Sequence, residues 1–291
     1  MPLDLLMEVP SYPRAGSKLN AMRMIIQGGG PAPNCMAGLK RLGLRAAIVA
    51  AVGNDVIARL TREELQRDGI SDRYLVVRKS SSDLAVGFIE HTTGDRTLVL
   101  HRGVSLQPRD INTARLPIPK VVHLDGRDLP ACIKLARWAR RIGAQVSFDI
   151  GSLRNDVSAI FPLVDHLVVA DAFALPFTKS RSISAACRKL AERCPGTIVV
   201  TNGIHGQMAY ENGSVHRQRA FVVKAVDTTG AGDAFHAGYL YGLIRGESLP
   251  VRLLLGSAVA ALNCTKLGAR EGLPTRAQLR KFLTGKPRLY A

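Results

Sequence analysis

The sequence predicts an α/β fold of the doubly wound type, in which a mostly parallel sheet is flanked by helices and accompanied by a small separate β-sheet. Two observations support this fold class. Helical and strand-like patterns alternate along most of the 291 residues, as they do in βαβ units. The alternation stops between residues 73 and 101, where turn residues instead of helices separate short strand-like runs, which is typical of hairpins.

The alternating pattern begins in the first quarter of the chain. A helix is expected near residues 33–42, followed by a strand at 45–52. A second helix is expected near residues 55–68, and Gly69 is placed to end it. This alternation of helix and strand favours a parallel sheet with helices on both faces.

The small sheet is predicted from runs that are too short and too closely spaced for helical crossovers. These runs are residues 3–9, 19–27, 74–78, 84–90 and 96–101. We expect hairpins among them, with polar turns at 80–83 and 92–95. The small sheet would then be drawn from about residues 3–27 and 73–101 and be inserted in a single domain of residues 1–291.

The alternating pattern resumes in the second half of the chain. Strands are expected at residues 120–124, 145–150, 166–169 and 197–201. A hairpin turning at Asn212-Gly213 comes next. A further strand at 219–226 and a helix at 231–245 complete the pattern, so that a glycine-rich run lies where this strand meets its helix.

Composition favours an ordinary globular protein. The chain is 46% hydrophobic and 22% charged, and its length suits one large α/β domain. No run of eighteen apolar residues occurs, and the first residues lack the basic start and apolar run of a signal peptide. We therefore expect a cytoplasmic protein with no membrane partner, whose five scattered cysteines are reduced and mostly buried.

The formal net charge of +17 suits a nucleic-acid binder as well as an enzyme for anionic substrates. The basic residues are spread along the chain without a basic tail or an aromatic ladder. This distribution favours a solvated basic surface and makes nucleic acid an unexpected partner.

The most informative segment is Val-Asp-Thr-Thr-Gly-Ala-Gly-Asp-Ala-Phe at residues 226–235. Glycines at the start of a helix let backbone N–H groups approach a ligand, and the helix dipole favours negative charge there. A carboxylate beside such a site is a poor phosphate ligand and a good proton acceptor for an attacking hydroxyl, which singles out Asp233. The simpler alternative is that Asp227 and Asp233 only cap the helix.

This run resembles the C-terminal signature of the ribokinase-like (PfkB) carbohydrate kinases, Asp-Thr-x-Gly-Ala-Gly-Asp-x-Phe. A second family signature, a glycine pair followed by Asn and a helix, matches residues 28–34. Further agreement at residues 201–206 and 268–274 extends the resemblance over essentially the whole chain. It implies a ribokinase-like fold, a lid sheet over the sugar that often forms a dimer, and ATP-dependent phosphorylation of a sugar.

The resemblance also implies roles for the residues of the signature. Asp233 is the base, and the backbone of Gly230, Ala231 and Gly232 stabilises charge on the transferring phosphoryl group. Asp227 and Thr229 match positions that bind a monovalent cation such as K⁺ in many members, although some members do without it.

On the sugar side, the resemblance places residues from several segments against hydroxyl groups: Asp4, Gly29, Gly30, Asn34 and Asp125. Carboxylate and amide groups suit hydroxyls because they accept and donate hydrogen bonds. Arg127 follows Asp125 by two, and side chains at such positions of a strand share a face. In the sulfofructose kinase branch an arginine here meets an anionic tail; Arg127 could equally serve a neutral ketose or pair with Asp125.

On the nucleotide side, the resemblance assigns ATP contacts to Thr201, Gly203 and Gly206. The adenine pocket is expected around residues 263–268, which include Asn263 and Gly268, near the end of a helix. The family's Asn-x-x-Glu motif for Mg²⁺ and phosphate is absent as such. Asp171 lies in the equivalent region and either substitutes for it or caps a helix.

Three expectations complete the interpretation. Family members open with a buried strand before the Asp that matches Asp4, so a first central strand is expected to be missing, either through a late start codon, which we favour, or in the sheet itself. Similarity to the ketohexokinase and sulfofructose kinase branches favours a ketose or an acidic relative as substrate. The alternative function is a catalytically idle sugar- or nucleic-acid-binding protein on the same fold.

Overall fold

The computed structural model describes residues 1–153 and 156–284. The chain divides into two compact units. Of the described residues, unit 1 contains those in 1–105, 223–237 and 259–281, and unit 2 contains those in 106–222, 238–258 and 282–284. Helices α6 (Ala231–Ile244) and α7 (Leu249–Asn263) contribute residues to both. The expected single domain of residues 1–291 stays a prediction.

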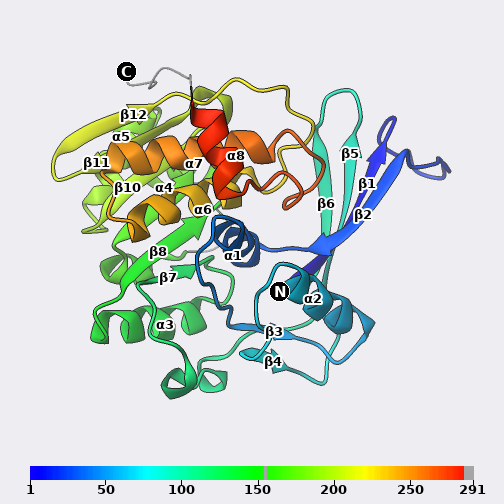
Figure 1. Ribbon diagram of the computed structural model, residues 1–291, viewed down its shortest axis with the longest axis horizontal. Helices are drawn as coiled ribbons and strands as arrows, with labels where there is room; N and C mark the ends of the chain where they lie inside the picture. The colour runs from blue at the N-terminus through cyan, green and yellow to red at the C-terminus, as the bar shows by residue number, and fades with distance from the viewer. Residues whose placement is uncertain (154–155, 285–291) are drawn as a thin grey trace. The chain divides into compact units, whose positions relative to one another are not determined.

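A four-stranded sheet organises unit 1, in the order β2 (Arg23–Gly28), β1 (Pro2–Val9), β5 (Asp83–Glu90) and β6 (Arg96–His101) (Figure 1). β1 and β5 are parallel, whereas the two outer pairs are antiparallel. Leu6, Ile89 and Leu267 pack together as a buried cluster with Ile25 beside them. The expected separate sheet is therefore present, and the expected hairpin between β5 and β6 is confirmed.

One expected member of the small sheet pairs elsewhere. Residues 74–78 were predicted to form a hairpin strand, but β4 (Leu75–Val77) pairs in parallel with β3 (Ala50–Val52) in a separate two-stranded sheet. The helix α2 (Val56–Arg67) joins these strands, so this connection is a crossover and not a hairpin. Of the strand predicted at 45–52, only the last three residues find a pairing partner, which explains its shortening.

Two helices in the first part of unit 1 start and end close to their predicted bounds because capping residues fix them. α1 (Pro31–Arg41) starts with a proline, whose fixed φ suits the first helical position. The α2 helix is capped by Asp55, which accepts a 2.8 Å hydrogen bond from the Ala58 N–H. Gly69 follows α2 in the left-handed conformation, with φ of 69°.

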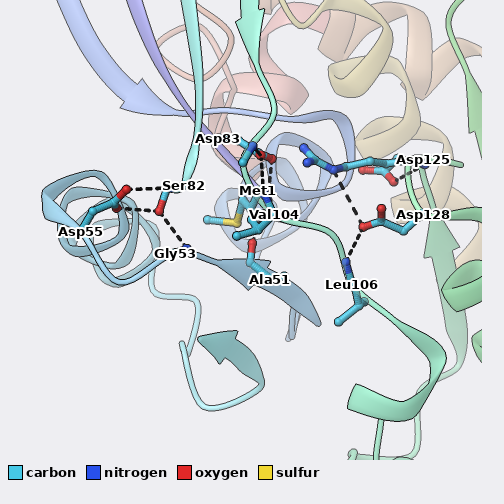
Figure 2. Close-up of polar contacts among 12 residues, drawn as sticks. Met1, Ala51, Gly53, Asp55, Ser82, Asp83, Val104, Leu106, Asp125 and Asp128 are labelled. Carbon is cyan, nitrogen blue, oxygen red and sulfur yellow. Dashed lines mark hydrogen bonds and ion pairs between the residues drawn. The ribbon is translucent and has the colours of Figure 1, made fainter. Parts of the chain in front are cut away.

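Buried polar contacts tie the start of β1 and β5 to their surroundings (Figure 2). The Met1 amine donates to the Ala51 carbonyl at 3.0 Å and lies 3.4 Å from Asp83 Oδ2. Asp83 Oδ1 accepts from the N–H groups of Gly103 and Val104. Met1 is thus held from two sides, while the expectation of a missing central strand stays a prediction.

A six-stranded sheet organises unit 2 (Figure 1). Its order is β12 (Ser214–Gln218), β11 (Gln207–Glu211), β10 (Thr197–Thr201), β9 (His166–Ala170), β8 (Gln145–Ile150) and β7 (Val121–Leu124). The strands from β7 to β10 are parallel, and β11 and β12 form the predicted antiparallel hairpin. The almost continuous burial of β8, β9 and β10 is typical of parallel strands covered on both faces.

Three helices of unit 2 connect its parallel strands: α3 (Leu129–Arg141) lies between β7 and β8, and α4 (Asp171–Thr178) and α5 (Ile183–Ala191) lie between β9 and β10. Together with the mostly parallel sheet and the separate small sheet, they confirm the predicted fold class. The remaining helix, α8 (Arg276–Leu283), follows the 268–274 segment.

The strand predicted at residues 219–226 is not formed. β12 ends at Gln218, and no regular structure follows until α6 begins at Ala231. The N–H groups of Val226 and Asp227 both donate to the Cys264 carbonyl, so this backbone is bonded to the end of α7 and not to a sheet. Val222, which alternation would place in a strand, is 96% exposed. The glycine-rich run therefore lies between a loop and a helix.

Two further sequence expectations can be compared with the described residues. Cys35, Cys132, Cys187 and Cys194 are buried and Cys264 is half-buried, in agreement with the expected burial of the thiols. Within residues 1–153 and 156–284, no helix has both the length and the apolar character needed to cross a membrane.

Candidate active site

The loop before α6 is organised by one buried carboxylate. Asp227 Oδ1 accepts hydrogen bonds from the Thr229 N–H at 2.8 Å and the Thr229 hydroxyl at 2.7 Å. Asp227 Oδ2 accepts from the Gly268 N–H at 2.8 Å. Asn263 supports the same loop by donating from Nδ2 to the Thr229 carbonyl. These bonds join the signature loop to the segment that follows α7.

Gly230 is a position that a side chain could not occupy without strain. Its φ is 72°, and an added Cβ would lie 2.6 Å from the Cβ of Ala269. A glycine therefore allows both the left-handed turn and the close approach of the 268–270 backbone. Gly232, by contrast, would meet no heavy atom within 4 Å, and it is exposed at the start of α6.

The first turn of α6 presents backbone donors beside Asp233. The Ala231 N–H donates to the Thr228 carbonyl at 3.1 Å, so this amide already serves a turn. The amide of Gly232 belongs to the first helical turn, whose N–H groups have no acceptor further back in the helix. Of the three residues predicted to stabilise an anion, Gly232 is thus the best placed, and the helix dipole adds to its effect.

Asp233 meets a residue of the other signature. Asn34, in the first turn of α1, donates from Nδ2 to Asp233 Oδ2 at 2.7 Å. The side-chain amide oxygen of Asn34, Oδ1, accepts a 2.8 Å hydrogen bond from Nε of Arg270. Asn34 and Arg270 are 4% and 3% exposed, so the contact between them is shielded from water, whereas the contact with Asp233 is only partly buried. The tertiary structure therefore brings two distant sequence motifs into direct contact.

Asp4 is the second carboxylate of this group. It is buried, and a Cβ on Gly29 would lie 2.0 Å from its Oδ1, so only a glycine fits there. The pKa of Asp4 is raised to about 6, chiefly by burial; the charge of Arg270 opposes the increase, Asp233 adds to it, and Arg96 opposes it more weakly. Gly30 precedes α1 with φ of 92° and turns the chain between the glycine pair and Asn34.

Unit 1 thus gathers most of the predicted residues of the sugar side and the signature. They are Asp4, Gly29, Gly30, Asn34, Asp227, Thr229, Gly230, Ala231, Gly232, Asp233, Asn263 and Gly268. Asn263 is completely buried and donates a hydrogen bond to the loop before α6. The adenine pocket expected around Asn263 and Gly268 stays a prediction.

Unit 2 holds the other predicted residues, at the carboxyl ends of its strands. Asp125 follows β7, and its Oδ1 accepts a 3.2 Å hydrogen bond from the Arg127 N–H. Gly126, between them, has φ of 69°, so these residues form a turn. The argument that both side chains share a strand face is therefore wrong. The Arg127 guanidinium lies 3.9 Å from Asp128 Oδ2, which also accepts from the Leu106 N–H (Figure 2).

The predicted nucleotide residues follow two neighbouring strands of unit 2. Thr201 ends β10 and donates from its hydroxyl to the Val169 carbonyl. Gly203 and Gly206 have φ of 49° and 87°, and a Cβ on Gly206 would lie 2.2 Å from the Gln218 carbonyl oxygen. Asp171 is the first residue of α4 and accepts a hydrogen bond from the Ala172 N–H. These positions are consistent with ligand contacts at strand ends, but the ATP and Mg²⁺ roles stay predictions.

Sequence reasoning missed Arg270 and its partner Asp68. Arg270 belongs to the segment 268–274 that carried part of the resemblance, yet no role was inferred for it. Its Nη1 donates to Asp68 Oδ2 at 2.7 Å, and both side chains are almost fully buried. An arginine inside a run of small and apolar residues is a sequence signal for a buried charge. The sequence could not name its partners, because Asn34 and Asp68 lie more than two hundred positions away.

Comparison with known proteins gives one consistent result. The sequence pattern of the pfkB family carbohydrate kinases matches residues 3–276. The 5-dehydro-2-deoxygluconokinase of Shouchella clausii is 24% identical and the alignment covers 88% of this chain and 86% of that protein. The ribokinase of Haemophilus influenzae is 25% identical, with 96% and 95% covered. The crystal structure of ribokinase from Thermotoga maritima superimposes with a TM-score of 0.87 over 98% and 97% of the two chains, at 23% identity, which shows the same fold.

Proposed function

This chain belongs to the pfkB family of carbohydrate kinases, and we propose that it transfers the γ-phosphoryl group of ATP to a hydroxyl of a small sugar, a ketose or an acidic relative of one. The observation that carries this proposal is the contact between Asn34 and Asp233 at the first turn of α6. In this contact the side-chain amide of Asn34, on α1, meets the carboxylate of Asp233 in the first turn of α6, so the proposed sugar side and the proposed base are adjacent. Phosphoryl transfer requires such an arrangement of acceptor site, base and backbone donors.

Asp233 is the proposed base. As the sugar oxygen bonds to the γ-phosphorus and the bond to the ADP oxygen breaks, the hydroxyl proton passes to the Asp233 carboxylate. Backbone N–H groups of the first turn of α6, with Gly232 foremost, stabilise the negative charge on the phosphoryl oxygens. The glycine at 232 leaves this approach open because no side chain covers the amide.

Asp4, Gly29 and Asn34 form the proposed sugar side in unit 1. An amide side chain has two N–H donors and an acceptor oxygen with two lone pairs. One donor of Asn34 serves Asp233 and one lone pair serves Arg270. Asn34 therefore keeps one N–H and one lone pair for sugar hydroxyls. Asp4 accepts hydroxyl hydrogen bonds most strongly when ionised.

The metal predictions can be weighed against the donor groups. Among the described residues, no cluster of three or more His, Cys, Asp or Glu side chains could hold a metal ion. Mg²⁺ usually binds through substrate phosphates, water and one or two carboxylates, and Asp171 suits one such contact. When bound, Mg²⁺ would neutralise phosphate charge. Asp227 accepts three hydrogen bonds of about four that a carboxylate can accept, so it can offer a K⁺ ion at most one lone pair.

The preference for a ketose or its acidic relative rests on the motif similarities and on Arg127. The guanidinium of Arg127 suits a carboxylate or sulfonate through paired hydrogen bonds. The similar enzyme of Shouchella clausii is named for an acidic sugar substrate and that of Haemophilus influenzae for a neutral one. Both classes therefore belong in any substrate test.

A coupled assay of ADP release against a panel of neutral and acidic sugars tests this function. Sugar-dependent ADP release from one or a few ketoses or keto acids, and its loss in Asp233→Asn, are expected. The alternative, a catalytically idle sugar- or nucleic-acid-binding protein, draws support only from the net charge of +17. Salt-dependent binding of mixed-sequence DNA without any sugar-stimulated turnover would favour that alternative.

A further inference from the structure

We propose that Arg270 is a positioning residue for phosphoryl transfer: its guanidinium fixes the side-chain amide of Asn34, and that amide holds the carboxylate of Asp233 in place. The inference rests on the proposed function, in which Asp233 is the base. It assigns a role to a buried ion pair, Arg270 with Asp68, that lies behind the sugar side of the site.

The contacts form one continuous series. Asp68 Oδ2 accepts from Arg270 Nη1 at 2.7 Å, and Arg270 Nε donates to Asn34 Oδ1 at 2.8 Å. Asn34 Nδ2 then donates to Asp233 Oδ2 at 2.7 Å. Acceptors and donors alternate along the series, so each group determines which way the next one faces.

The direction of the Asn34 amide is the central step. If the amide turned over, its N–H groups would face the guanidinium N–H and its oxygen would face the Asp233 carboxylate. Both contacts would be repulsive, because guanidinium has only donors and an ionised carboxylate only acceptors. Arg270 therefore selects the orientation in which Asn34 donates to Asp233.

Burial makes this selection strong. Arg270 is 3% exposed and Asn34 is 4% exposed, so water does not compete for their hydrogen bonds. Burial lowers the pKa of Arg270, but Asp68, Asp4 and Glu64 all favour its charged form. The guanidinium is thus held as a cation by a group of carboxylates, one of which is Asp4 on the sugar side.

The glycine signature makes room for this side chain. A Cβ on Gly28 would lie 2.5 Å from Arg270 Nη1 and 2.8 Å from its Cζ. Gly28 ends β2, and its N–H donates to Glu64 Oε2 at 3.2 Å. The first glycine of the run is therefore a slot for the guanidinium, whereas Gly29 makes room for Asp4.

Lysine cannot replace Arg270 in this arrangement. An ammonium group is a single point at the end of a flexible chain, whereas Nε and Nη1 of arginine donate in two fixed directions. Arg270→Lys keeps the positive charge opposite Asp68 but loses the directed donation to Asn34.

A double-mutant cycle between Arg270→Lys and Asn34→Ala tests the proposal. In the parent, Arg270→Lys is expected to lower kcat by roughly tenfold or more because the base is misplaced. In the Asn34→Ala background, the same change is expected to lower kcat less than about twofold, since the connection is already broken. Equal fold losses of kcat in both backgrounds, or no loss in either, would overturn the proposal.

Arg140→Lys is the matched control. Arg140 also makes a 2.7 Å ion pair, with Asp165, but it is half exposed and lies in unit 2. Its replacement is expected to leave kcat unchanged. The proposed function fails separately if Asp233→Asn retains parental turnover, so the two failures remain distinguishable.

Gly28→Ala provides a second route if Arg270→Lys does not fold. The added methyl group displaces the guanidinium while leaving every charge in place, and the φ of Gly28 is one that alanine adopts. The same cycle with Asn34→Ala then applies. A kcat that falls equally in the two backgrounds would again contradict the proposed role of Arg270.

Discussion

Asn34 Nδ2 and Asp233 Oδ2 lie 2.7 Å apart, although 199 residues separate them in sequence. The contact joins the first turn of α1 to the first turn of α6 within unit 1. It links the Gly-Gly-x-x-x-Asn signature to the Gly-Ala-Gly-Asp signature by a direct hydrogen bond. The two motifs that appear independent in sequence therefore meet at one place in the fold.

Asp233→Asn tests the assigned base directly. Asparagine has nearly the size of aspartate, and its side-chain oxygen can still accept a hydrogen bond from Asn34. Its amide, however, cannot accept the hydroxyl proton. We expect kcat to fall roughly a hundredfold or more, with little change in sugar affinity. Steady-state kinetics together with calorimetric sugar binding measure both quantities. Near-parental turnover would remove Asp233 from the mechanism.

Asp4→Asn should stabilise the fold at high pH. The folded-state pKa of Asp4 is about 6 against an ordinary value of 3.8, so ionisation of Asp4 disfavours the folded state. Protonated Asp4 therefore contributes to the free energy of unfolding in full below about pH 4, and this contribution is lost as the pH rises through about 6.

The measurement is the Tm of parent and variant between pH 4 and pH 8, compared at each pH. The variant is expected to be more stable at pH 8, by on the order of 1–3 kcal/mol, and the difference should disappear towards pH 4. A difference that does not change with pH would show that burial of the charge is not its cause. Sugar binding should weaken in the variant at every pH.

Arg127→Ala distinguishes acidic from neutral substrates. If Arg127 binds an anionic tail, its loss should raise KM for an acidic sugar by roughly tenfold or more, given about 1.5–3 kcal/mol for a hydrogen bond to a charged group. KM for neutral sugars should change little. Steady-state kinetics on one sugar of each kind, with Arg140→Ala as control, provide the comparison. Equal losses on both sugars would assign Arg127 to the shape of the pocket instead.

A dimer through the small sheet is the fourth prediction. Both edge strands of the sheet carry exposed apolar side chains: Met24 and Ile26 on β2, and Leu98, Val99 and Leu100 on β6. Unpaired edges with apolar side chains need a covering partner. Light scattering of the parent should give a dimer, and Val99→Glu should shift it towards monomer. Val222→Glu changes an exposed valine of unit 2 and should leave the mass unaltered.

Gly230→Ala should be more damaging than an equivalent glycine change elsewhere. Gly230 and Gly246 have φ of 72° and 75°, but only at Gly230 would a Cβ meet another atom, Ala269 Cβ at 2.6 Å. Gly246→Ala is expected to cost about 1 kcal/mol from backbone conformation alone. Gly230→Ala should cost clearly more and lower turnover, as chemical denaturation and kinetics would measure. Equal costs would show that the 268–270 backbone yields easily.

Much of the fold followed from local pattern. Helices α1 and α2 have their proline, capping aspartate and glycine in sequence, and the buried strands of unit 2 are continuous apolar runs. These signals are short-range, because a cap or a turn involves residues within a few positions. The pattern failed at residues 74–78 and 219–226, since strand pairing depends on which distant backbone is available.

The sequence by itself determined the family, the glycine run and the acidic side chain that follows it, since these are contiguous motifs. Only the tertiary structure decided that Asn34 contacts Asp233, that Asp4 is buried beside Gly29, and that Asp227 is occupied by its own loop. It alone revealed Arg270, whose partners, Asn34 in α1 and Asp68 directly after α2, are far away in sequence. The reason is physical: hydrogen bonds and desolvation depend on the distance between groups in space, and for residues some two hundred positions apart the sequence does not give that distance.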